Sequence, residues 1–330
     1  MTSGTWRVLA LPPLDIALLR ALVDPLGGAA ELTVPETRDA AGLHAALADA
    51  DVVIGDFTGA LALDEAAVAA APKLAFVQMP QVGVDGVDLK ALTEAGVPVA
   101  NTAGANARAV AEWAVGATFA LCRQLAWADR RVRAGDWPQN EVLARGTREI
   151  HALRIGIVGY GAIGVRAAEL FTALGADVAY WTRTPREQAV AAYLPLDELV
   201  AASDVIVLAV PLTADTAGLF DAARIARMKP RALLVNVARG GLVDEDALAA
   251  ALDSGALGGA ALDVFAAEPA PADSPLRRHD NVLLSPHVAG ATAEAQSSII
   301  GKVIDNVAAA VRGEPVSGVV NGLDPVIRRR

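Results

Sequence analysis

The stretch RIGIVGYGAIG, residues 154–164, is the most informative part of the chain, because an apolar run typical of a buried strand leads directly into three glycines. Gly159 permits a tight turn, Gly161 lets the backbone approach a pyrophosphate, and Gly164 allows a helix to pack closely on the strand. In a chain with 29 glycines, such a spacing can also arise by chance. The strand before it and the helical pattern after it favour a dinucleotide-binding turn, made of Gly159, Gly161, Ala162, Ile163 and Gly164.

On both sides of this turn, short apolar runs alternate with helical patterns, which predicts an α/β protein with parallel sheets. Before the turn, strands are expected at residues 8–10, 32–34, 52–54, 74–77 and 97–100. After the first strand of the second series, further strands are expected at 178–181, 205–209, 233–236, 260–264 and 282–284. Helices are expected between them at 162–174, 196–202, 221–228 and 244–252, the last with Asp244 as its N-cap.

Two longer helical patterns suggest how the domains are connected. Residues 106–133 carry helical periodicity without proline, and we expect one helix there that bridges two domains and ends at Gly135 and Pro138. A second long helix, at about 292–311, follows the last strand and is expected to return the chain to the first domain. We therefore predict a dinucleotide-binding domain at 104–290 and a discontinuous substrate domain made of residues 1–103 and 291–330.

Composition narrows the functional classes. The chain has 330 residues, enough for two domains, and its 54% apolar share contains no uncharged run of the roughly 18 residues that a membrane-spanning helix needs. No signal-peptide pattern opens the sequence, so we expect a cytoplasmic protein without a membrane partner. The net charge of −10 argues against a nucleic-acid partner.

The cysteine and the basic C-terminal run carry weaker signals. Cys122 is the single cysteine, so it cannot form an intramolecular disulfide, and its apolar neighbours indicate a buried side chain. No Cys/His cluster has zinc spacing, and we expect no metal site. The basic run at residues 328–330 is interpreted as a solvated tail.

The end of the second strand after the glycine turn bears on the choice of cofactor. An acidic residue there would receive the ribose hydroxyls of NAD, but residues 178–186, VAYWTRTPR, contain none, and Asp177 lies at the opposite end of the strand. The alternative is a solvated basic loop without a ligand. We predict NADP(H) as the preferred cofactor, with NAD(H) as the alternative, and the phosphate partners Thr182, Arg183 and Thr184, with Arg186 in a supporting role.

Three polar residues each follow an apolar strand: Arg239, Glu268 and His287. Alone, each has an ordinary explanation, as a surface arginine, a loop carboxylate or a structural histidine. Together they supply an arginine to hold the carboxylate and carbonyl of a 2-oxo acid and a histidine to exchange a proton with its oxygen. The carboxylate would orient that histidine and favour its protonated form. We predict that Arg239, Glu268 and His287 are the catalytic residues.

Around these residues the chain resembles the D-isomer-specific 2-hydroxyacid dehydrogenase family, which includes glyoxylate and hydroxypyruvate reductases. The resemblance extends over nearly the whole sequence and includes residues 82–88 (VGVDGVD), 101–106 (NTAGAN), 110–112 (VAE) and 210–213 (VPLT), together with the Arg239, Glu268 and His287 segments.

The resemblance implies a flavodoxin-like substrate domain beside a Rossmann-type dinucleotide-binding domain, and a homodimer. It implies that the amides of Val82 and Gly83 bind the substrate carboxylate, and that Val210, Pro211 and Asp263 contact the cofactor. The expected partner is then a small 2-oxo or 2-hydroxy acid of the glyoxylate or hydroxypyruvate type. A nucleotide-sensing corepressor of the same fold is the alternative, because such a protein can retain the same three polar residues.

Overall fold

The structure, a computed structural model, describes residues 4–330, which form two compact units. Unit 1 consists of residues up to 106 together with 293–330, and unit 2 consists of residues 107–292. The sequence-based expectation puts these boundaries at 103/104 and 290/291. Each unit is built on a parallel sheet with helices on both faces, which confirms the predicted α/β class.

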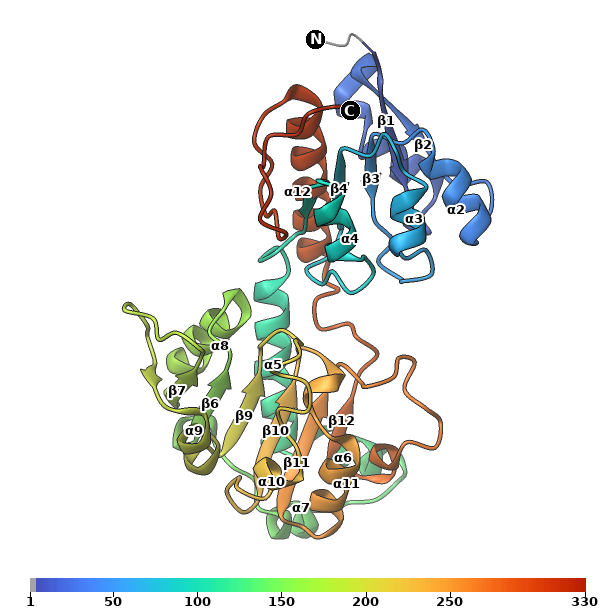
Figure 1. The fold of residues 1–330 in the computed structure, drawn as a ribbon. Helices are drawn as coiled ribbons and strands as arrows, with labels where there is room; N and C mark the ends of the chain where they lie inside the picture. Colours follow the sequence, from blue (N-terminus) through green and yellow to red (C-terminus); the bar gives the residue numbers. More distant parts are fainter. Residues whose placement is uncertain (1–3) are drawn as a thin grey trace. The chain divides into compact units, whose positions relative to one another are not determined.

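Unit 1 has a five-stranded sheet in the order β2-β1-β3-β4-β5, of which Figure 1 labels β1 to β4. This is the flavodoxin-like order implied by the resemblance. The strands are β1 (Trp6–Ala10), β2 (Ala30–Thr33), β3 (Val52–Ile54), β4 (Phe76–Gln78) and β5 (Val99–Ala100). One face packs on α1 (Ile16–Ala21), η1 (Asp24–Ala29) and α12 (Ala293–Arg312). The other face packs on α2 (Ala40–Leu47), α3 (Glu65–Ala69) and α4 (Leu89–Glu94).

Unit 2 has a seven-stranded sheet in the order β12-β11-β10-β9-β6-β7-β8, with every pair parallel. Counted from β6, this is the Rossmann strand order with one strand added at the edge. The strands are β6 (Arg154–Val158), β7 (Asp177–Trp181), β8 (Ala192–Tyr193), β9 (Val205–Leu208), β10 (Ala232–Asn236), β11 (Leu257–Leu262) and β12 (Val282–Leu284).

The helices of unit 2 cover both faces of this sheet (Figure 1). One face packs on α5 (Ala107–Cys122) and α8 (Ala162–Ala173). The other packs on α9 (Leu196–Ala202), α10 (Ala222–Ile225) and α11 (Glu245–Asp253). Asp244 caps α11 by accepting a hydrogen bond from the N–H of Ala247, which confirms the predicted N-cap. Cys122 is buried as predicted, and burial raises the pKa of its thiol to about 11.

The single helix expected over residues 106–133 is wrong. The structure has α5 and then α6 (Leu125–Arg133), separated at Gln124, whose φ of 55° is left-handed. A left-handed residue cannot continue a right-handed helix, and neither glycine nor proline marks this break in the sequence. All of α5 belongs to unit 2 and begins directly after the boundary between residues 106 and 107, and the bridging role expected of this helix stays a prediction. A further helix, α7 (Gln139–Arg145), had no counterpart in the sequence analysis.

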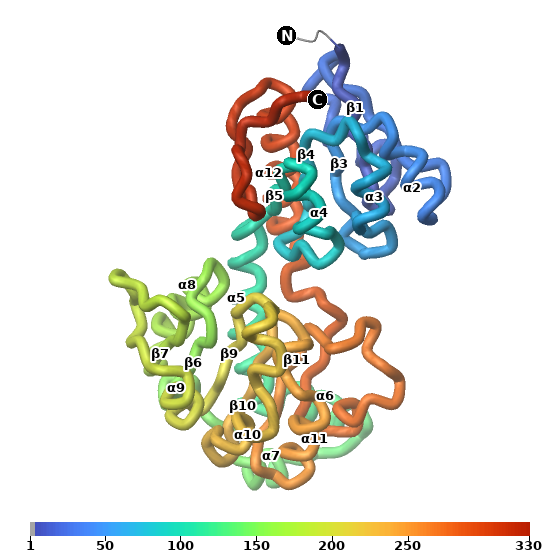
Figure 2. Tube along the Cα trace, viewed as in Figure 1, coloured from blue at the N-terminus to red at the C-terminus, as the bar shows by residue number. Residues whose placement is uncertain are grey.

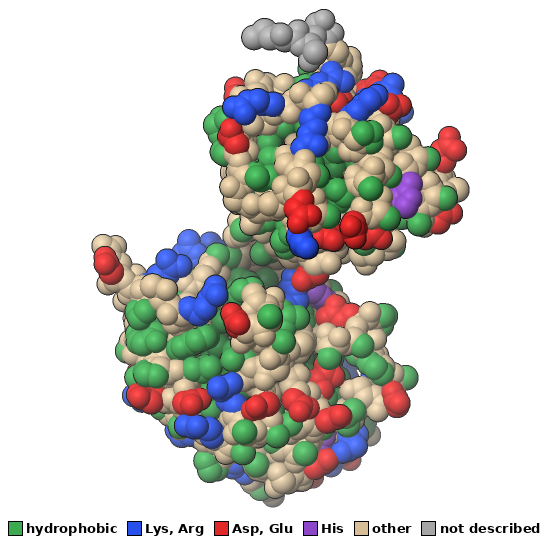
Figure 3. Space-filling model, in the orientation of Figure 1, with side chains coloured by type: hydrophobic (Ala, Val, Ile, Leu, Met, Phe, Trp, Pro, Cys, Tyr) green, Lys and Arg blue, Asp and Glu red, His purple; other side chains and the backbone are tan. Residues whose placement is uncertain are grey.

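The surface of both units carries charge of both signs. On the face shown in Figure 3, Asp and Glu side chains are interspersed with Lys and Arg side chains. Within residues 4–330, no helix is both long enough and apolar enough to cross a bilayer.

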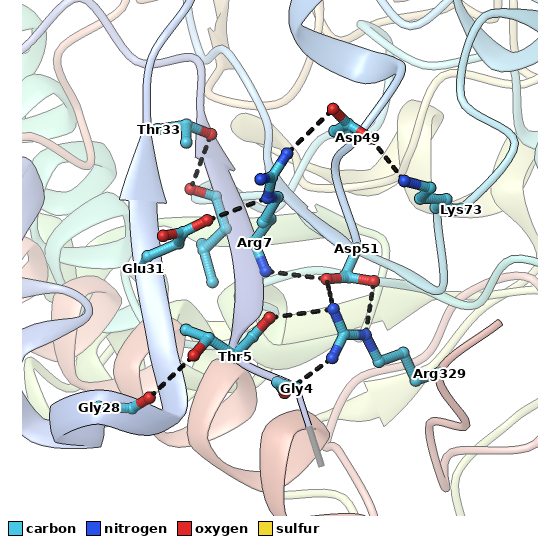
Figure 4. Close-up of polar contacts among 11 residues, drawn as sticks. Gly4, Thr5, Arg7, Gly28, Glu31, Thr33, Asp49, Asp51, Lys73 and Arg329 are labelled. Atoms are coloured by element: carbon cyan, nitrogen blue, oxygen red, sulfur yellow. Dashed lines mark hydrogen bonds and ion pairs between the residues drawn. The ribbon is translucent and has the colours of Figure 1, made fainter. Parts of the chain in front are cut away.

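The C-terminal segment is fixed to unit 1, so the interpretation of residues 328–330 as a solvated tail is wrong for Arg329. The segment runs back along β5 (Figure 2), where Val320 donates a backbone hydrogen bond to Val99. The Arg329 guanidinium binds both carboxylate oxygens of Asp51, each at 2.9 Å, and donates to the carbonyls of Gly4 and Thr5 (Figure 4). Asp51 is 2% exposed, so this contact satisfies a buried charge.

We expect Arg329→Ala to lower the free energy of unfolding of unit 1 by about 2–4 kcal/mol, because removing one partner leaves the buried Asp51 carboxylate without its cation. Arg328→Ala is the matched control, since the Arg328 side chain is 79% exposed and pairs with exposed Asp324. Hydrogen exchange of the β1 and β3 peptides measures the difference. Equal exchange in the two variants would contradict this role of Arg329.

Candidate active site

Three neighbouring strands of unit 2 bring the predicted catalytic segments together. Arg239 follows β10, Glu268 follows β11 and His287 follows β12, and these strands lie side by side in the sheet. The turns after β10 and β11 are in close contact, because a Cβ added to Gly240 would lie 1.8 Å from the carbonyl carbon of Phe265. The carboxyl edge of the sheet is where open α/β sheets bind ligands. Glycine at position 240 is therefore required for the two turns to meet.

Glu268 and His287 form a hydrogen-bonded pair. The Nδ1 atom of His287 lies 2.8 Å from the Oε2 atom of Glu268, and the other carboxylate oxygen accepts the N–H of Phe265 at 3.0 Å. A carboxylate acceptor places a proton on Nδ1, which leaves Nε2 as the ring nitrogen that can exchange a proton with a substrate. The His287 side chain is 49% exposed, so small molecules can reach it. The pair has the arrangement of an acid/base histidine held by a carboxylate.

The turn that carries His287 is anchored by Asp263, a role that the sequence analysis missed. His287 has a φ of 55°, in the left-handed region that non-glycine residues rarely adopt. The carboxylate of Asp263, 1% exposed, accepts hydrogen bonds from the Ser285 hydroxyl at 2.5 Å and from the backbone N–H groups of Val288 and Ala289, each at 2.8 Å. Its backbone carbonyl accepts the N–H of His287 at 2.8 Å. Asp263 thus holds the backbone on both sides of the histidine, and its predicted contact with the cofactor stays a prediction.

Arg239 lies in a turn shaped by a buried asparagine. Asn236, at the end of β10, donates from its side chain to the Arg239 carbonyl at 2.9 Å and accepts the N–H of Ala238 at 3.1 Å. The Arg239 side chain is half-buried, and its Nη1 donates to the Ala238 carbonyl at 2.7 Å. A guanidinium in this place can present two parallel N–H groups to a carboxylate.

The glycine turn has the geometry that a dinucleotide phosphate needs. Gly159 has a φ of 103°, and a Cβ there would lie 2.4 Å from the carbonyl oxygen of Ala209. A Cβ on Gly164 would lie 1.9 Å from the Gly159 carbonyl oxygen, whereas one on Gly161 would meet nothing within 4 Å. Gly159 and Gly164 therefore allow neighbouring backbone segments to pack closely, and Gly161 leaves open space in front of the N-terminus of α8. Helix α8 begins at Ala162, followed by Ile163, and its N-cap residue Gly161 makes no side-chain cap. Because the first backbone N–H groups of the helix are then available, the residues fit a bound phosphate.

Next to this turn lies an open cavity of about 610 Å³ that the segment after β7 helps to line. Its lining includes Tyr160, Gly161, Ala162, Val165 and residues 185–188. Arg186 is part of this lining, while exposed Arg183 and its neighbours Thr182 and Thr184 are not. Asp177 begins β7 and pairs with Arg154, at the end of the strand away from the cavity.

The remaining predicted residues lie in two other loops. Val210 and Pro211 follow β9, beside the strand that carries the glycine turn, and the Thr216 hydroxyl donates to the Pro211 carbonyl at 2.7 Å. Val82 and Gly83 belong to unit 1, in the loop after β4, where the side chain of Asn101 donates to the Val82 carbonyl at 2.7 Å. Each loop therefore follows the carboxyl end of a strand in its own unit.

Comparison with known proteins gives one consistent family. Residues 115–289 match the family model for the D-isomer specific 2-hydroxyacid dehydrogenase, NAD binding domain. The chain is 39% identical to the D-3-phosphoglycerate dehydrogenase of Mycobacterium leprae over 94% of its own length, but it spans only 59% of that protein. It is 38% identical to the glyoxylate reductase of Thermofilum pendens over 78% of each chain. The holo D-mandelate dehydrogenase of Rhodotorula graminis superposes with a TM-score of 0.89, at 27% identity, over 97% of this chain and 99% of that one.

Proposed function

The chain belongs to the D-isomer specific 2-hydroxyacid dehydrogenase family, and from that premise we propose that it interconverts a small D-2-hydroxy acid and its 2-oxo acid with NADP(H), and less efficiently with NAD(H). The observation that carries this proposal is the Glu268–His287 pair, 2.8 Å apart at the carboxyl edge of the sheet that also carries the glycine turn. The homodimer implied by the resemblance stays a prediction for this chain.

The chain's own residues have distinct roles in this reaction. When bound, the nicotinamide cofactor supplies the hydride that the carbonyl carbon of the 2-oxo acid takes up. His287 donates a proton from Nε2 to the carbonyl oxygen, and Glu268 holds the imidazole through Nδ1. Arg239 binds the substrate carboxylate and orients the carbonyl, and the backbone amides of Val82 and Gly83 also bind the carboxylate. Oxidation of the hydroxy acid uses the same groups in reverse.

An unphosphorylated substrate of the glyoxylate or hydroxypyruvate type fits this chain better than a phosphorylated one. Residues 79–89, which include Val82 and Gly83, contain Asp85 and Asp88 but neither lysine nor arginine. In unit 1, the guanidinium of Arg38 forms an ion pair with the buried carboxylate of Asp56, with Nη2 and Oδ2 2.8 Å apart, and so already has an anionic partner. The phosphate group of a phosphorylated substrate would meet acidic rather than basic side chains along this loop.

Turnover of a panel of 2-oxo acids by the purified protein tests the proposal. We expect NADPH-dependent reduction of glyoxylate and hydroxypyruvate, with kcat/KM above that for 3-phosphohydroxypyruvate, measured by loss of the absorbance of the reduced nicotinamide. A higher kcat/KM for the phosphorylated acid would contradict the substrate class. Absence of turnover without a protein partner would favour the corepressor-like alternative.

Glu268→Gln should lower kcat by about tenfold or more, and Glu268→Ala by more, because the amide keeps an acceptor near Nδ1 but loses the charge. The measurement is kcat of both variants and of the wild type with the same 2-oxo acid. A Gln variant with the kcat of the wild type would count against the pairing.

A further inference from the structure

Tyr180 makes contacts that a core residue does not need. It lies in β7 and is 1% exposed, with its side chain in the same apolar cluster as Phe171 of α8. Its hydroxyl accepts the backbone N–H of Arg186 at 2.8 Å and donates to the carbonyl of the same residue at 3.3 Å. Phenylalanine would fill the core without these bonds. The hydroxyl is therefore used to hold the segment that follows the strand.

The ring of Tyr180 also contacts the glycine turn. It stacks on Tyr160, the residue between Gly159 and Gly161, with ring centroids 3.9 Å apart and an angle of 26° between the planes. Tyr160 is 3% exposed, so the stack is a fixed internal contact. Through Tyr180, the turn that would receive the pyrophosphate and the segment around Arg186 are held against one another.

Arg186 is suited to bind an anion in the adjacent cavity. Among residues 4–330 its side chain forms no ion pair, whereas Arg154, Arg166 and Arg224 in the same unit are each paired with an acidic residue. Arg186 lines the 610 Å³ cavity together with Gly161. The next residue, Glu187, lines the cavity too and has the opposite charge. A ligand in this cavity can therefore meet a positive or a negative side chain from this segment.

We propose that Tyr180 is a positioning residue for cofactor selection: by binding both the N–H and the C=O of Arg186, it directs that guanidinium toward a phosphate on the 2′-hydroxyl of the adenosine ribose. Two hydrogen bonds to one residue hold the peptide planes on both of its sides, and so hold the direction of the Cα–Cβ bond from which its side chain starts. This inference rests on the proposed preference for NADP(H). It gives a physical cause for the backbone orientation of Arg186, which the sequence analysis placed beside Arg183 only in a supporting role.

Binding of two nucleotides that lack nicotinamide tests the inference without turnover. The probes are 2′,5′-ADP, which carries the 2′-phosphate, and 5′-AMP, which does not, titrated calorimetrically into the full chain. We expect the wild type to prefer 2′,5′-ADP by at least about tenfold. Arg186→Ala should weaken 2′,5′-ADP by about tenfold and Tyr180→Phe by about threefold to tenfold, both with little change for 5′-AMP.

The double variant distinguishes positioning from a general structural role. If Tyr180 acts through Arg186, then Tyr180→Phe should weaken 2′,5′-ADP no further in the Arg186→Ala background. Tyr193→Phe is the matched control, because the Tyr193 ring packs edge-to-face with Tyr180, with ring centroids 5.7 Å apart, whereas the hydroxyl that bonds to Arg186 is that of Tyr180. Hydrogen exchange of residues 182–191 should rise in Tyr180→Phe while that of β6 stays unchanged.

The titrations and the exchange measurement separate failure of this inference from failure of the proposed cofactor preference. Equal weakening of both nucleotides, the same loss in the Arg186→Ala background, or unchanged exchange at 182–191 would overturn the role of Tyr180. If the wild type prefers 2′,5′-ADP over 5′-AMP and Tyr180→Phe keeps the same preference, this inference is wrong and the proposed cofactor preference stands. A wild type that binds both nucleotides equally would remove the cofactor preference, and this inference with it.

Discussion

Replacing His287 with alanine should lower kcat by about 10²- to 10⁴-fold, with little change in the affinity for the cofactor, because a positioned general acid contributes about that much. The Glu268 carboxylate 2.8 Å from Nδ1 fixes the ring, so the lost group is one whose orientation is already set. Steady-state kcat and the Kd of the cofactor, measured under conditions where chemistry limits turnover, check this expectation.

The backbone at residue 287 requires a second variant. With a φ of 55°, alanine there adds strain, whereas asparagine tolerates this conformation and also cannot act as the acid. Both His287→Ala and His287→Asn should lose activity, and His151→Ala, on an exposed side chain remote from the sheet's carboxyl edge, should not. A fall of less than about fivefold in kcat for His287→Asn would rule out His287 as the acid.

Much of the fold follows from signals that are local in the sequence. The glycine turn combines an apolar run, three spaced glycines and a helical pattern within residues 154–174, and each part has its own physical requirement. The placement of Arg239, Glu268 and His287 after three neighbouring strands also follows from local signals. Each comes directly after an apolar strand, and the carboxyl ends of neighbouring parallel strands share one edge.

Contacts between residues far apart in the chain could not be predicted in this way. Arg329 pairs with Asp51 across 278 positions, and nothing near either residue indicates its partner. The break at Gln124 lacks glycine and proline, so periodicity runs through it unchanged. Asp263 and Tyr180 bind backbone groups of loops, and every residue type except proline has the same backbone N–H donor, so the sequence does not indicate which one is bound. Their side chains could be predicted to be buried, but not what they hold.

Replacing Arg183 with alanine should weaken NADPH binding by about 10- to 150-fold, the equivalent of about 1.5–3 kcal/mol for one charge-assisted contact. NADH should be nearly unaffected, since it has no 2′-phosphate for a guanidinium to meet. The lower end of the range is expected, because Arg186 lines the adjacent cavity and shares the phosphate. The measurement is kcat/KM for both cofactors in the wild type and the variant.

A matched control and a reversal make this test decisive. Arg227→Ala removes a guanidinium of the same unit that is paired with Asp197, and it should change neither cofactor's kcat/KM. Thr182→Asp should go further than Arg183→Ala and favour NADH, because it places a carboxylate just beyond β7, where an acid can accept the ribose hydroxyls and repels a 2′-phosphate. The absence of an acid at this point is the reason to expect NADP(H). A wild type that favours NADH, or an Arg183→Ala variant that loses both cofactors equally, would show that the segment after β7 does not select the cofactor.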